Sequence, residues 1–280
     1  MTKPKTAAMT LILTLVVALA VAVAGCGKSD NPTPRARPKG PLSTIEPGVL
    51  TVGTELPAPT FWGGADYRTV KTGFEYDLAR ELARRNGRLQ VKVVECPFVA
   101  IIAGASCDCD IDFSQISITK ERRAHWDFTV PYFDADYGVM VKTSSTVSTV
   151  AQARTQQFGV QAETTALDFL ETRLRPVKPP KTYDTTQEMF DAFNTGEVDA
   201  ILFDLPILLS AMKEAQVADA KIVGQLKTGD RYGGALPKGS RNTAIVNRTM
   251  LAIISDGTLA RLQRQYFGVT TRNAAPFWQP

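Results

Sequence analysis

The chain has 280 residues, with 32 Lys and Arg against 28 Asp and Glu, so its formal net charge is +4. Its 44% hydrophobic and 21% charged residues indicate a globular protein and exclude a disordered, collagen-like or disulfide-dense chain. This near-neutral charge gives no reason to expect nucleic acid as a partner. A chain of this length usually folds as two core-bearing units. One His and four Cys exclude a His-rich metal site, and a His-based triad can use only His125.

The amino terminus has the pattern of an export signal. Lys3 and Lys5 precede an uncharged, mostly apolar stretch over residues 6–25, and small residues then lead to Cys26. The sequence Val23-Ala24-Gly25-Cys26 resembles the lipobox of bacterial lipoproteins. That resemblance implies a signal peptide over residues 1–25 and lipidation of Cys26. The alternative is an uncleaved transmembrane helix, because about 20 apolar residues can span a bilayer. Both interpretations export the rest of the chain and hold it at the membrane.

Residues 26–46 are rich in Pro, Gly and polar side chains, so they cannot bury much apolar area. We expect an extended tether there. Its basic residues either lie near anionic headgroups or are simply solvated.

The next part of the chain alternates strand and helix patterns. β-branched and apolar runs predict strands over residues 49–53, 89–95 and 110–114. Apolar residues at helical spacing predict a helix over residues 73–86, and a short helix is expected over 99–105. This β-α-β-α-β order is typical of an open parallel sheet.

A second series of strands and helices starts near residue 157. Strands are expected over 157–161, 199–203 and 221–223, with a linker and short strand over 179–183. Helices are expected over 164–174, 186–195 and 206–215. An amphipathic helix pair over 243–265, broken near residues 256–257, follows. The restart predicts two similar α/β lobes instead of one large sheet.

The stretch over residues 114–122 (SQISITKER) follows a strand and opens a helix. Helix starts expose unpaired N–H groups, and Arg122 about a turn later can hold a carboxylate with two hydrogen bonds. The alternative is that Thr119 caps the helix and Arg122 lies on a solvated face.

Three more stretches join a strand end to polar or aromatic residues. Residues 160–165 (VQAETT) place threonines at a helix start, where they are also ordinary N-caps. Asp204 ends an apolar strand, where an acid can receive an ammonium group or cap the next helix. Residues 53–62 (GTELPAPTFW) carry an acid and two aromatic side chains. Together the four stretches supply a carboxylate clamp, an ammonium acceptor and an aromatic wall, which suit a free amino acid.

The chain resembles the amino-acid-type extracellular solute-binding proteins of ABC importers. Eight segments carry the resemblance, in the family's order: LTVGTELPAPTFW, TGFEYDLARELARRNG, PFVAIIAG, SQISITKERRAHWDFTVPYF, FGVQAETTALDFLE, EVDAILFDLPI, YGGALPKGS and DGTLARLQRQYFG.

The resemblance implies a two-lobed, periplasmic-binding-protein-like α/β fold of type II. Two open mixed sheets would be joined by a two-strand hinge and would close on ligand between them. Chain order makes lobe one residues 47–138 and 235–269, lobe two residues 143–230, and residues 270–280 a C-terminal tail. The hinge passes are expected near residues 138–142 and 231–235.

Carried over position by position, the resemblance assigns ligand-binding roles in both lobes. Arg122 matches the carboxylate-binding arginine, Ser117 the hydroxyl residue beside it, and Gln115 a residue whose backbone meets the ligand. Asp204 matches the acid that receives the α-ammonium group. The other assigned positions are Glu55, which senses the ligand side chain, the aromatic Phe98, the helix start at Thr164 and Thr165 with the preceding Gln161, and Phe61 as an extra wall.

Two positions depart from the family pattern. Glu163 stands where relatives usually have Gly, which puts the lobe-two anion contact in doubt. Ala58 stands where many relatives have an aromatic residue, so Phe98 or Phe61 must supply the stacking surface. Glu55 favours a ligand side chain with hydrogen-bond donors, and it argues against aspartate and glutamate as ligands.

The resemblance also implies the partners. We expect a monomer without cofactor or bound nucleic acid, held at the extracytoplasmic face by lipid on Cys26, that delivers a polar amino acid to the permease of an ABC importer. The alternative is a periplasmic dehydratase or lyase on the same fold, with Glu163 or Glu55 as its acid/base. A receptor domain that feeds a sensor is a third option, although the sequence shows no signalling domain.

Cys96, Cys107 and Cys109 remain after lipidation of Cys26. Export permits disulfides, and residues two apart rarely satisfy disulfide geometry, so Cys96 pairs better with Cys107 or with Cys109. One buried free thiol would remain. The alternative is a metal site formed by these three cysteines and His125.

Overall fold

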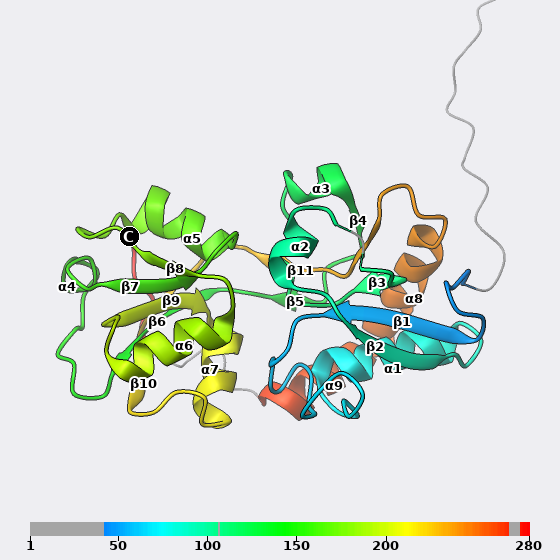
Figure 1. Ribbon diagram of the computed structural model, residues 1–280, viewed down its shortest axis with the longest axis horizontal. Coiled ribbons are helices and arrows are strands. Elements are labelled where there is room, and N and C mark those ends of the chain that lie inside the picture. Colours follow the sequence, from blue (N-terminus) through cyan, green and yellow to red (C-terminus); the bar gives the residue numbers. More distant parts are fainter. Residues whose placement is uncertain (1–41, 106, 269–274) are drawn as a thin grey trace, which may run out of the picture. The chain divides into compact units, whose positions relative to one another are not determined.

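Two five-stranded mixed sheets carry the fold in this computed structural model, which describes residues 42–105, 107–268 and 275–280 (Figure 1). All of these residues belong to the unit Arg37–Pro280, one of two into which the chain divides. The expected signal peptide, most of the tether and Cys26 lie outside the described residues. Within the described ranges, no helix is long and apolar enough to cross a membrane.

The first sheet has the order β2-β1-β3-β12-β4. β1 pairs in parallel with both of its neighbours, and β12 runs antiparallel to β3 and β4. Its strands are β1 (Val49–Thr54), β2 (Gln90–Glu95), β3 (Ile111–Asp112), β4 (Trp126–Phe128) and β12 (Ala235–Pro237).

Three helices pack together over this sheet and close the larger core of lobe one: α1 (Phe74–Arg85), α8 (Thr243–Ser255) and α9 (Thr258–Phe267). The short helix α2 (Phe98–Ile102) belongs to a smaller core around Cys96, Ile101 and Trp126, and the short helix α3 (Arg122–His125) packs beside β4.

The second sheet has the order β10-β6-β9-β7-β8. β7 is parallel to β8 and β9, whereas β6 is antiparallel to β9 and β10. Its strands are β6 (Tyr137–Lys142), β7 (Phe158–Gln161), β8 (Lys181–Tyr183), β9 (Ala200–Asp204) and β10 (Ala220–Leu226).

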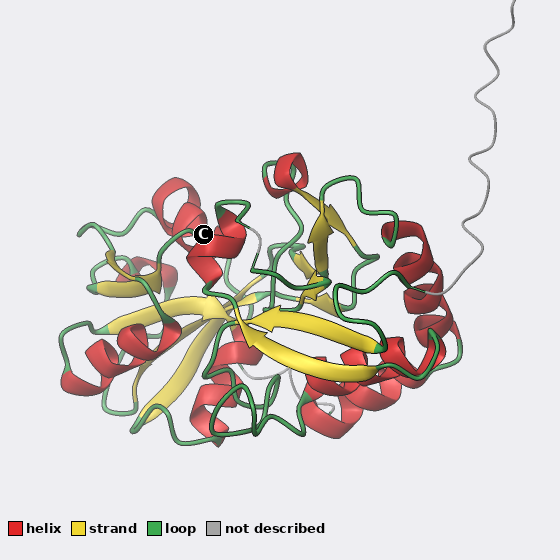
Figure 2. Cartoon of the chain, turned by 45° about the vertical axis from the view of Figure 1, so that its right-hand side comes forward, coloured by secondary structure: helices red, strands yellow, loops and turns green. Residues whose placement is uncertain are grey.

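Helices flank this second sheet, and Figures 1 and 2 show them against its strands. They are α4 (Val150–Ala153), α5 (Thr165–Phe169), α6 (Thr186–Thr195) and α7 (Leu205–Lys213), with a π-helical turn η1 (Leu170–Leu174) that continues α5. α5 contacts β7 and β9, and α7 contacts β6 and β9, so helices frame the carboxyl ends of β7 and β9.

The two lobes are joined by a short antiparallel pair, β5 (Phe133–Asp134) with β11 (Arg231–Tyr232). The first crossing was expected near residues 138–142, but these residues belong to β6 of the second sheet. These residues therefore form a buried strand of the second sheet and not a crossing between the lobes. We accordingly propose that the first segment of lobe one ends near residue 132 instead of 138.

The carboxyl terminus lies on the second lobe, although α9 packs in the first. Pro276 and Ala275 accept hydrogen bonds from the backbone and side chain of Gln225 in β10. Trp278 is buried against Gly224, where a Cβ would approach its ring to 2.3 Å. The expected C-terminal tail is thus attached to lobe two over residues 275–278, and Trp278 belongs to the lobe-two core.

Most expected elements are confirmed within a few residues. The helix expected over 164–174 becomes α5 and a π-helical turn, and the strand expected over 110–114 is only Ile111–Asp112. The strands β4 and β12 were not expected, and β6 was expected only as one pass of the two-strand hinge.

Candidate functional site

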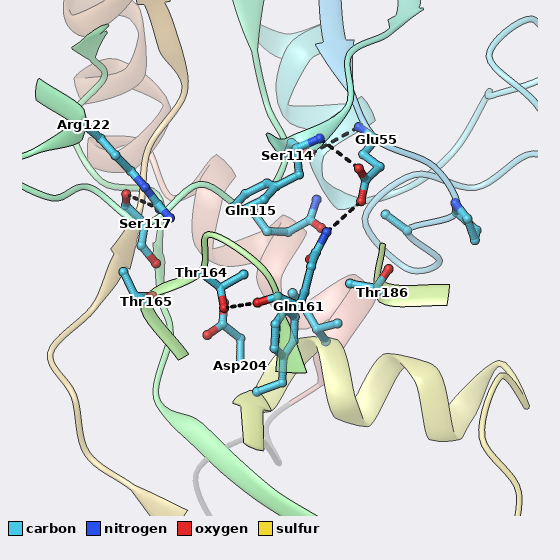
Figure 3. A pocket seen from close by; sticks show the side chains of 15 residues that line it. Glu55, Ser114, Gln115, Ser117, Arg122, Gln161, Thr164, Thr165, Thr186 and Asp204 are labelled. Atoms are coloured by element: carbon cyan, nitrogen blue, oxygen red, sulfur yellow. Dashed lines mark hydrogen bonds between the residues drawn. The ribbon is translucent and has the colours of Figure 1, made fainter. Parts of the chain in front are cut away.

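One pocket brings together nine of the ten residues that the sequence assigned to ligand binding (Figure 3). From lobe one these are Glu55, Phe98, Gln115, Ser117 and Arg122; from lobe two they are Gln161, Thr164, Thr165 and Asp204. The pocket therefore lies between the carboxyl ends of strands from both sheets, where open α/β sheets place ligands.

Arg122 is held in the pocket by backbone oxygens of both lobes. Its side chain is buried, and its guanidinium donates to the carbonyl oxygens of Ser117 at 2.9 Å and Glu163 at 3.0 Å. It also lies 5.5 Å from the centroid of the Phe98 ring. Burial lowers the pKa of Arg122, and the charge of Asp204 opposes that shift. A guanidinium has five N–H groups, so others can serve a carboxylate.

The alternative interpretation of residues 114–122 is right for Thr119 and wrong for Arg122. Thr119 Oγ1 accepts a hydrogen bond from the Arg122 backbone N–H at 3.1 Å, as a residue that caps the turn would. The Arg122 side chain is nevertheless 6% exposed, whereas the next residue, Arg123, is exposed. The solvated-face prediction is therefore wrong for Arg122.

Asp204 ends β9 and is the N-cap residue of α7, but its side chain makes no cap hydrogen bond. It accepts instead a 2.5 Å hydrogen bond from the Tyr232 hydroxyl. Burial raises the pKa of Asp204 to about 7; Tyr232 and Arg122 oppose this shift, while Asp230 adds to it. The sequence did not single out Tyr232, and its only signal was a tyrosine within an expected hinge pass.

Glu55 connects the two lobes through side-chain contacts. Its Oε2 accepts from the Phe98 backbone N–H at 2.8 Å, and its Oε1 accepts from Gln161 Nε2 at 3.0 Å. Gln161 also donates to the Asp184 carbonyl oxygen at 3.1 Å. Burial raises the pKa of Glu55, and these hydrogen bonds oppose the shift. Both carboxylate oxygens of Glu55 thus already accept a hydrogen bond within the protein, and a ligand would have to share them.

The N-cap interpretation of the lobe-two threonines is confirmed for Thr164. Thr164 is the N-cap of α5, where its Oγ1 accepts from the Leu167 N–H at 3.2 Å and donates to the Gln161 carbonyl at 2.7 Å. It also lines the pocket. Glu163 keeps the left-handed backbone that Gly favours, with φ 59°, and its side chain is exposed. Its carbonyl, and not its carboxylate, contacts Arg122.

Phe61 does not line this pocket, which corrects its assignment as an extra wall. It is 1% exposed and packs in the lobe-one core against Phe74, Phe133 and Phe267. A tight turn causes this, because the N–H groups of Phe61 and Trp62 both bond to the Ala58 carbonyl. Of the two aromatic candidates, Phe98 is the one that lines the pocket.

Six further lining residues were not among the assigned ones: Pro57, Ala58, Ser114, Thr186, Phe203 and Ile207. Ser114 Oγ accepts from the Glu55 N–H at 3.2 Å. Thr186 begins α6 next to a capping box formed by Thr185 and Glu188, which is a helix-start signal readable in the sequence.

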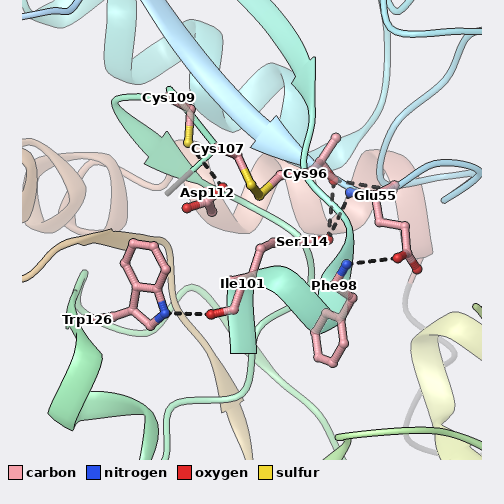
Figure 4. Close-up of a disulfide and its surroundings, with 10 residues drawn as sticks. Glu55, Cys96, Phe98, Ile101, Cys107, Cys109, Asp112, Ser114 and Trp126 are labelled. Atoms are coloured by element: carbon pink, nitrogen blue, oxygen red, sulfur yellow. Dashed lines mark hydrogen bonds between the residues drawn. A yellow bond between two sulfur atoms is a disulfide. The ribbon is translucent and has the colours of Figure 1, made fainter. Parts of the chain in front are cut away.

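Close to the pocket, Cys96 is disulfide-bonded to Cys107, one of the two expected pairings (Figure 4). The bond closes a loop that contains α2, the helix of Phe98. Cys109 is a buried free thiol that lies 3.1 Å from Asp112 Oδ1. Burial raises the pKa of Asp112 to about 6, and the Cys109 hydrogen bond opposes it. In the described part of the chain, no group of three or more His, Cys, Asp or Glu side chains could hold a metal ion.

Comparison with known proteins agrees with this geometry. The model of the bacterial extracellular solute-binding proteins, family 3, matches residues 50–269. The chain belongs to this family.

Several proteins that resemble this chain are binding proteins. The L-cystine-binding protein TcyJ of Escherichia coli is 28% identical over 227 residues, which cover 80% of this chain and 84% of the relative. The solved structure of an ancestral arginine-binding protein bound to glutamine is 31% identical, with a TM-score of 0.70, and covers 79% of this chain and 98% of that one. An ancestral amino acid-binding protein described as a precursor of cyclohexadienyl dehydratase is 27% identical, with a TM-score of 0.69, and covers 79% of this chain and 96% of that one.

Proposed function

We propose that the protein binds a polar amino acid outside the cytoplasm and delivers it to the permease of an ABC importer. The observation that carries this proposal is that Arg122 from lobe one and Asp204 from lobe two line the same pocket. Within the described residues they form no salt bridge with each other, so a zwitterion can bring a carboxylate to Arg122 and an ammonium group to Asp204. A ligand that touches both lobes favours the state in which they are close.

A desolvated zwitterion needs a partner for each charge, since an unpaired buried charge is costly. The Arg122 guanidinium is suited to a carboxylate, and Ser117 and Gln115 supply polar groups beside it. The Phe98 ring offers an apolar surface next to the guanidinium. Glu55 and Gln161 lie at another part of the pocket wall, and we assign them to the ligand side chain.

The test is a thermal-shift screen of the twenty amino acids, because a ligand that binds only the native state raises its melting temperature. A polar amino acid should raise the melting temperature in proportion to the logarithm of its concentration. If none of the twenty changes the melting temperature, the proposal is wrong.

The same proposal includes a lipid anchor on Cys26 and a monomeric protein. Export and lipidation follow from the order of positive, apolar and small residues before Cys26. Replacement of Cys26 by Ala should move the protein from the membrane fraction to the soluble one, and mass spectrometry of the wild type should show an acylated amino terminus. An unmodified Cys26 in the mature protein would reject the anchor.

A second function has specific support, because the pocket contains one buried acid, Asp204, and one half-buried acid, Glu55, whose pKa values are raised. Such acids suit a dehydratase or lyase. Glu163 does not fit this role, since its side chain is exposed and does not line the pocket. Turnover of a prephenate-like acid, without a thermal shift from any amino acid, would favour the enzyme.

A further inference from the structure

Behind the pocket wall, the first turn of α1 carries a carboxyl group that is wholly buried. Glu75 is 0% exposed, and its two oxygens accept four hydrogen bonds. Oε1 accepts from the Gln115 backbone N–H at 3.0 Å and from the Tyr132 hydroxyl. Oε2 accepts from Gln115 Nε2 at 2.6 Å and from Trp62 Nε1 at 2.7 Å. None of the four donors belongs to a cationic side chain.

The donor types define the role of this acid. The Gln115 backbone N–H and the Trp62 indole N–H can only donate, so an acceptor must face both. The Tyr132 hydroxyl and the Gln115 side-chain amide can each donate or accept. Burial raises the pKa of Glu75, and its hydrogen bonds from Tyr132, Gln115 and Trp62 oppose that shift. The carboxylate form satisfies all four donors at once.

Two of these bonds hold one pocket residue in an unusual conformation. Gln115 lines the pocket and has φ 50°, a left-handed backbone that residues other than Gly, Asn and Asp rarely adopt. Because Glu75 binds both the backbone and the side chain of Gln115, it fixes the orientation of the wall between Ser114 and Ser117.

The same network reaches the hinge and the other lobe. Tyr132 lies directly before β5, and its N–H donates to the Tyr232 carbonyl at 2.9 Å. The Tyr232 hydroxyl in turn donates to Asp204. Glu75 is therefore joined to the lobe-one wall of the pocket on one side and to the hinge residue that holds Asp204 on the other.

We propose that Glu75 is a positioning residue for ligand binding, which keeps Gln115 in its ligand-ready conformation before the ligand arrives. This inference rests on the proposed function of the pocket as an amino-acid site. When the pocket wall is already ordered, ligand binding does not have to spend free energy on ordering it. Removal of the Glu75 carboxylate should therefore weaken binding, although Glu75 itself does not contact the ligand.

The decisive variant is Glu75→Gln, which keeps the side-chain volume but turns one acceptor oxygen into a donor that faces an N–H group able only to donate, that of the Gln115 backbone or of the Trp62 indole. L-Arginine, L-glutamine and L-cystine are titrated by calorimetry against the wild type and the variant. Whichever of them binds the wild type should bind the variant at least tenfold more weakly. In a Gln115→Gly background, where the left-handed backbone needs no anchor, Glu75→Gln should cost clearly less.

The matched control is Asp110→Asn, a second buried carboxylate that accepts two backbone hydrogen bonds. Asp110 bonds to the N–H groups of Ile45 and Thr51, both at 2.8 Å, and lies outside the pocket lining. This variant should lower the melting temperature but leave the ligand affinity within twofold. The contrast separates a loss of positioning from a general loss of stability.

A readout in the ligand-free protein separates this inference from the proposed function. The NMR signal of the Gln115 backbone amide should be protected from solvent exchange in the wild type, and it should shift in Glu75→Gln. Equal affinities of the wild type and Glu75→Gln for the same amino acid would overturn the inference. If Glu75→Gln does not fold, a Gln115 amide in the wild type that exchanges as fast as an exposed loop would overturn it. Absence of any amino-acid binding to the wild type would instead overturn the proposed function.

Discussion

Replacement of Arg122 by Ala should abolish most of the ligand affinity and little of the fold. In the wild type the guanidinium is 6% exposed, and two of its N–H groups bind the carbonyls of Ser117 and Glu163. A ligand carboxylate that pairs with the remaining N–H groups would lose that partner in Arg122→Ala. One buried charge left unpaired costs about 3–5 kcal/mol. At about 1.4 kcal/mol per tenfold, the dissociation constant should rise by at least roughly 100-fold.

The matched control is the neighbouring residue on the same short helix. Arg123 is exposed and its guanidinium lies 5.8 Å from the centroid of the Phe128 ring, away from the pocket lining. Arg123→Ala should therefore change the affinity by less than about twofold, as expected for an exposed charge. Arg122→Lys should fall between the two, because it keeps the charge but loses the two-pronged geometry.

The assay is isothermal titration calorimetry with the amino acid that gives the largest thermal shift. The melting temperature of each ligand-free variant is measured in parallel, because a loss of folded protein would imitate a loss of affinity. An affinity of Arg122→Ala within threefold of the wild type would refute the role of Arg122 as the carboxylate clamp.

Three further changes should give results with a definite sign. The ligand ammonium group must bind the carboxylate form of Asp204, whose pKa is raised to about 7. The ligand affinity should therefore fall about tenfold per pH unit below pH 7 and level off above it. A ligand affinity that calorimetry finds constant from pH 5 to 7 would contradict this. Asp204→Asn should weaken an amino acid far more than its deaminated analogue, and equal losses in calorimetry would reject its ammonium role. Gly224→Ala should lower the melting temperature, because its Cβ would meet the Trp278 ring at 2.3 Å; an unchanged value would show that the carboxyl terminus is not anchored there.

The amino-acid sequence predicted the fold wherever local patterns and tertiary context agree. The strand and helix pairs of each lobe follow from periodicity, as for β1 with α1 and for β9 with α7. β6 was misjudged, because a buried run such as Tyr137–Met140 has the same composition whether it crosses a hinge or lies in a sheet. Only its pairing with β9 and β10 distinguishes the two.

The site was predictable where the residue type and the family resemblance point to the same chemistry. Arg122 and Asp204 were predicted to share one site from the family resemblance and from their opposite charges, and both line the pocket. The direction of Phe61 could not be predicted, since an aromatic side chain next to a turn can face the core or the pocket, and a single backbone turn at Ala58 decides the direction.

Glu75 and Tyr232, which hold pocket residues in place, could not be predicted from the sequence for another reason. Glu75 lies in the first turn of a helix, where an acid is an ordinary partner of the helix dipole. Tyr232 lies in a short strand where aromatic residues are common. Their roles arise only from contacts with residues 40 and 28 positions away, Gln115 and Asp204.

The central claim is that both charges of an amino acid are recognised at once, by Arg122 and by Asp204. The most direct measurement is calorimetric titration of the wild type with the bound amino acid, with its analogue that lacks the carboxylate and with its analogue that lacks the amino group. We predict that each analogue binds at least roughly 100-fold more weakly than the parent, because each leaves one buried charge of the pocket unpaired. An analogue that binds as tightly as the parent amino acid would contradict the claim.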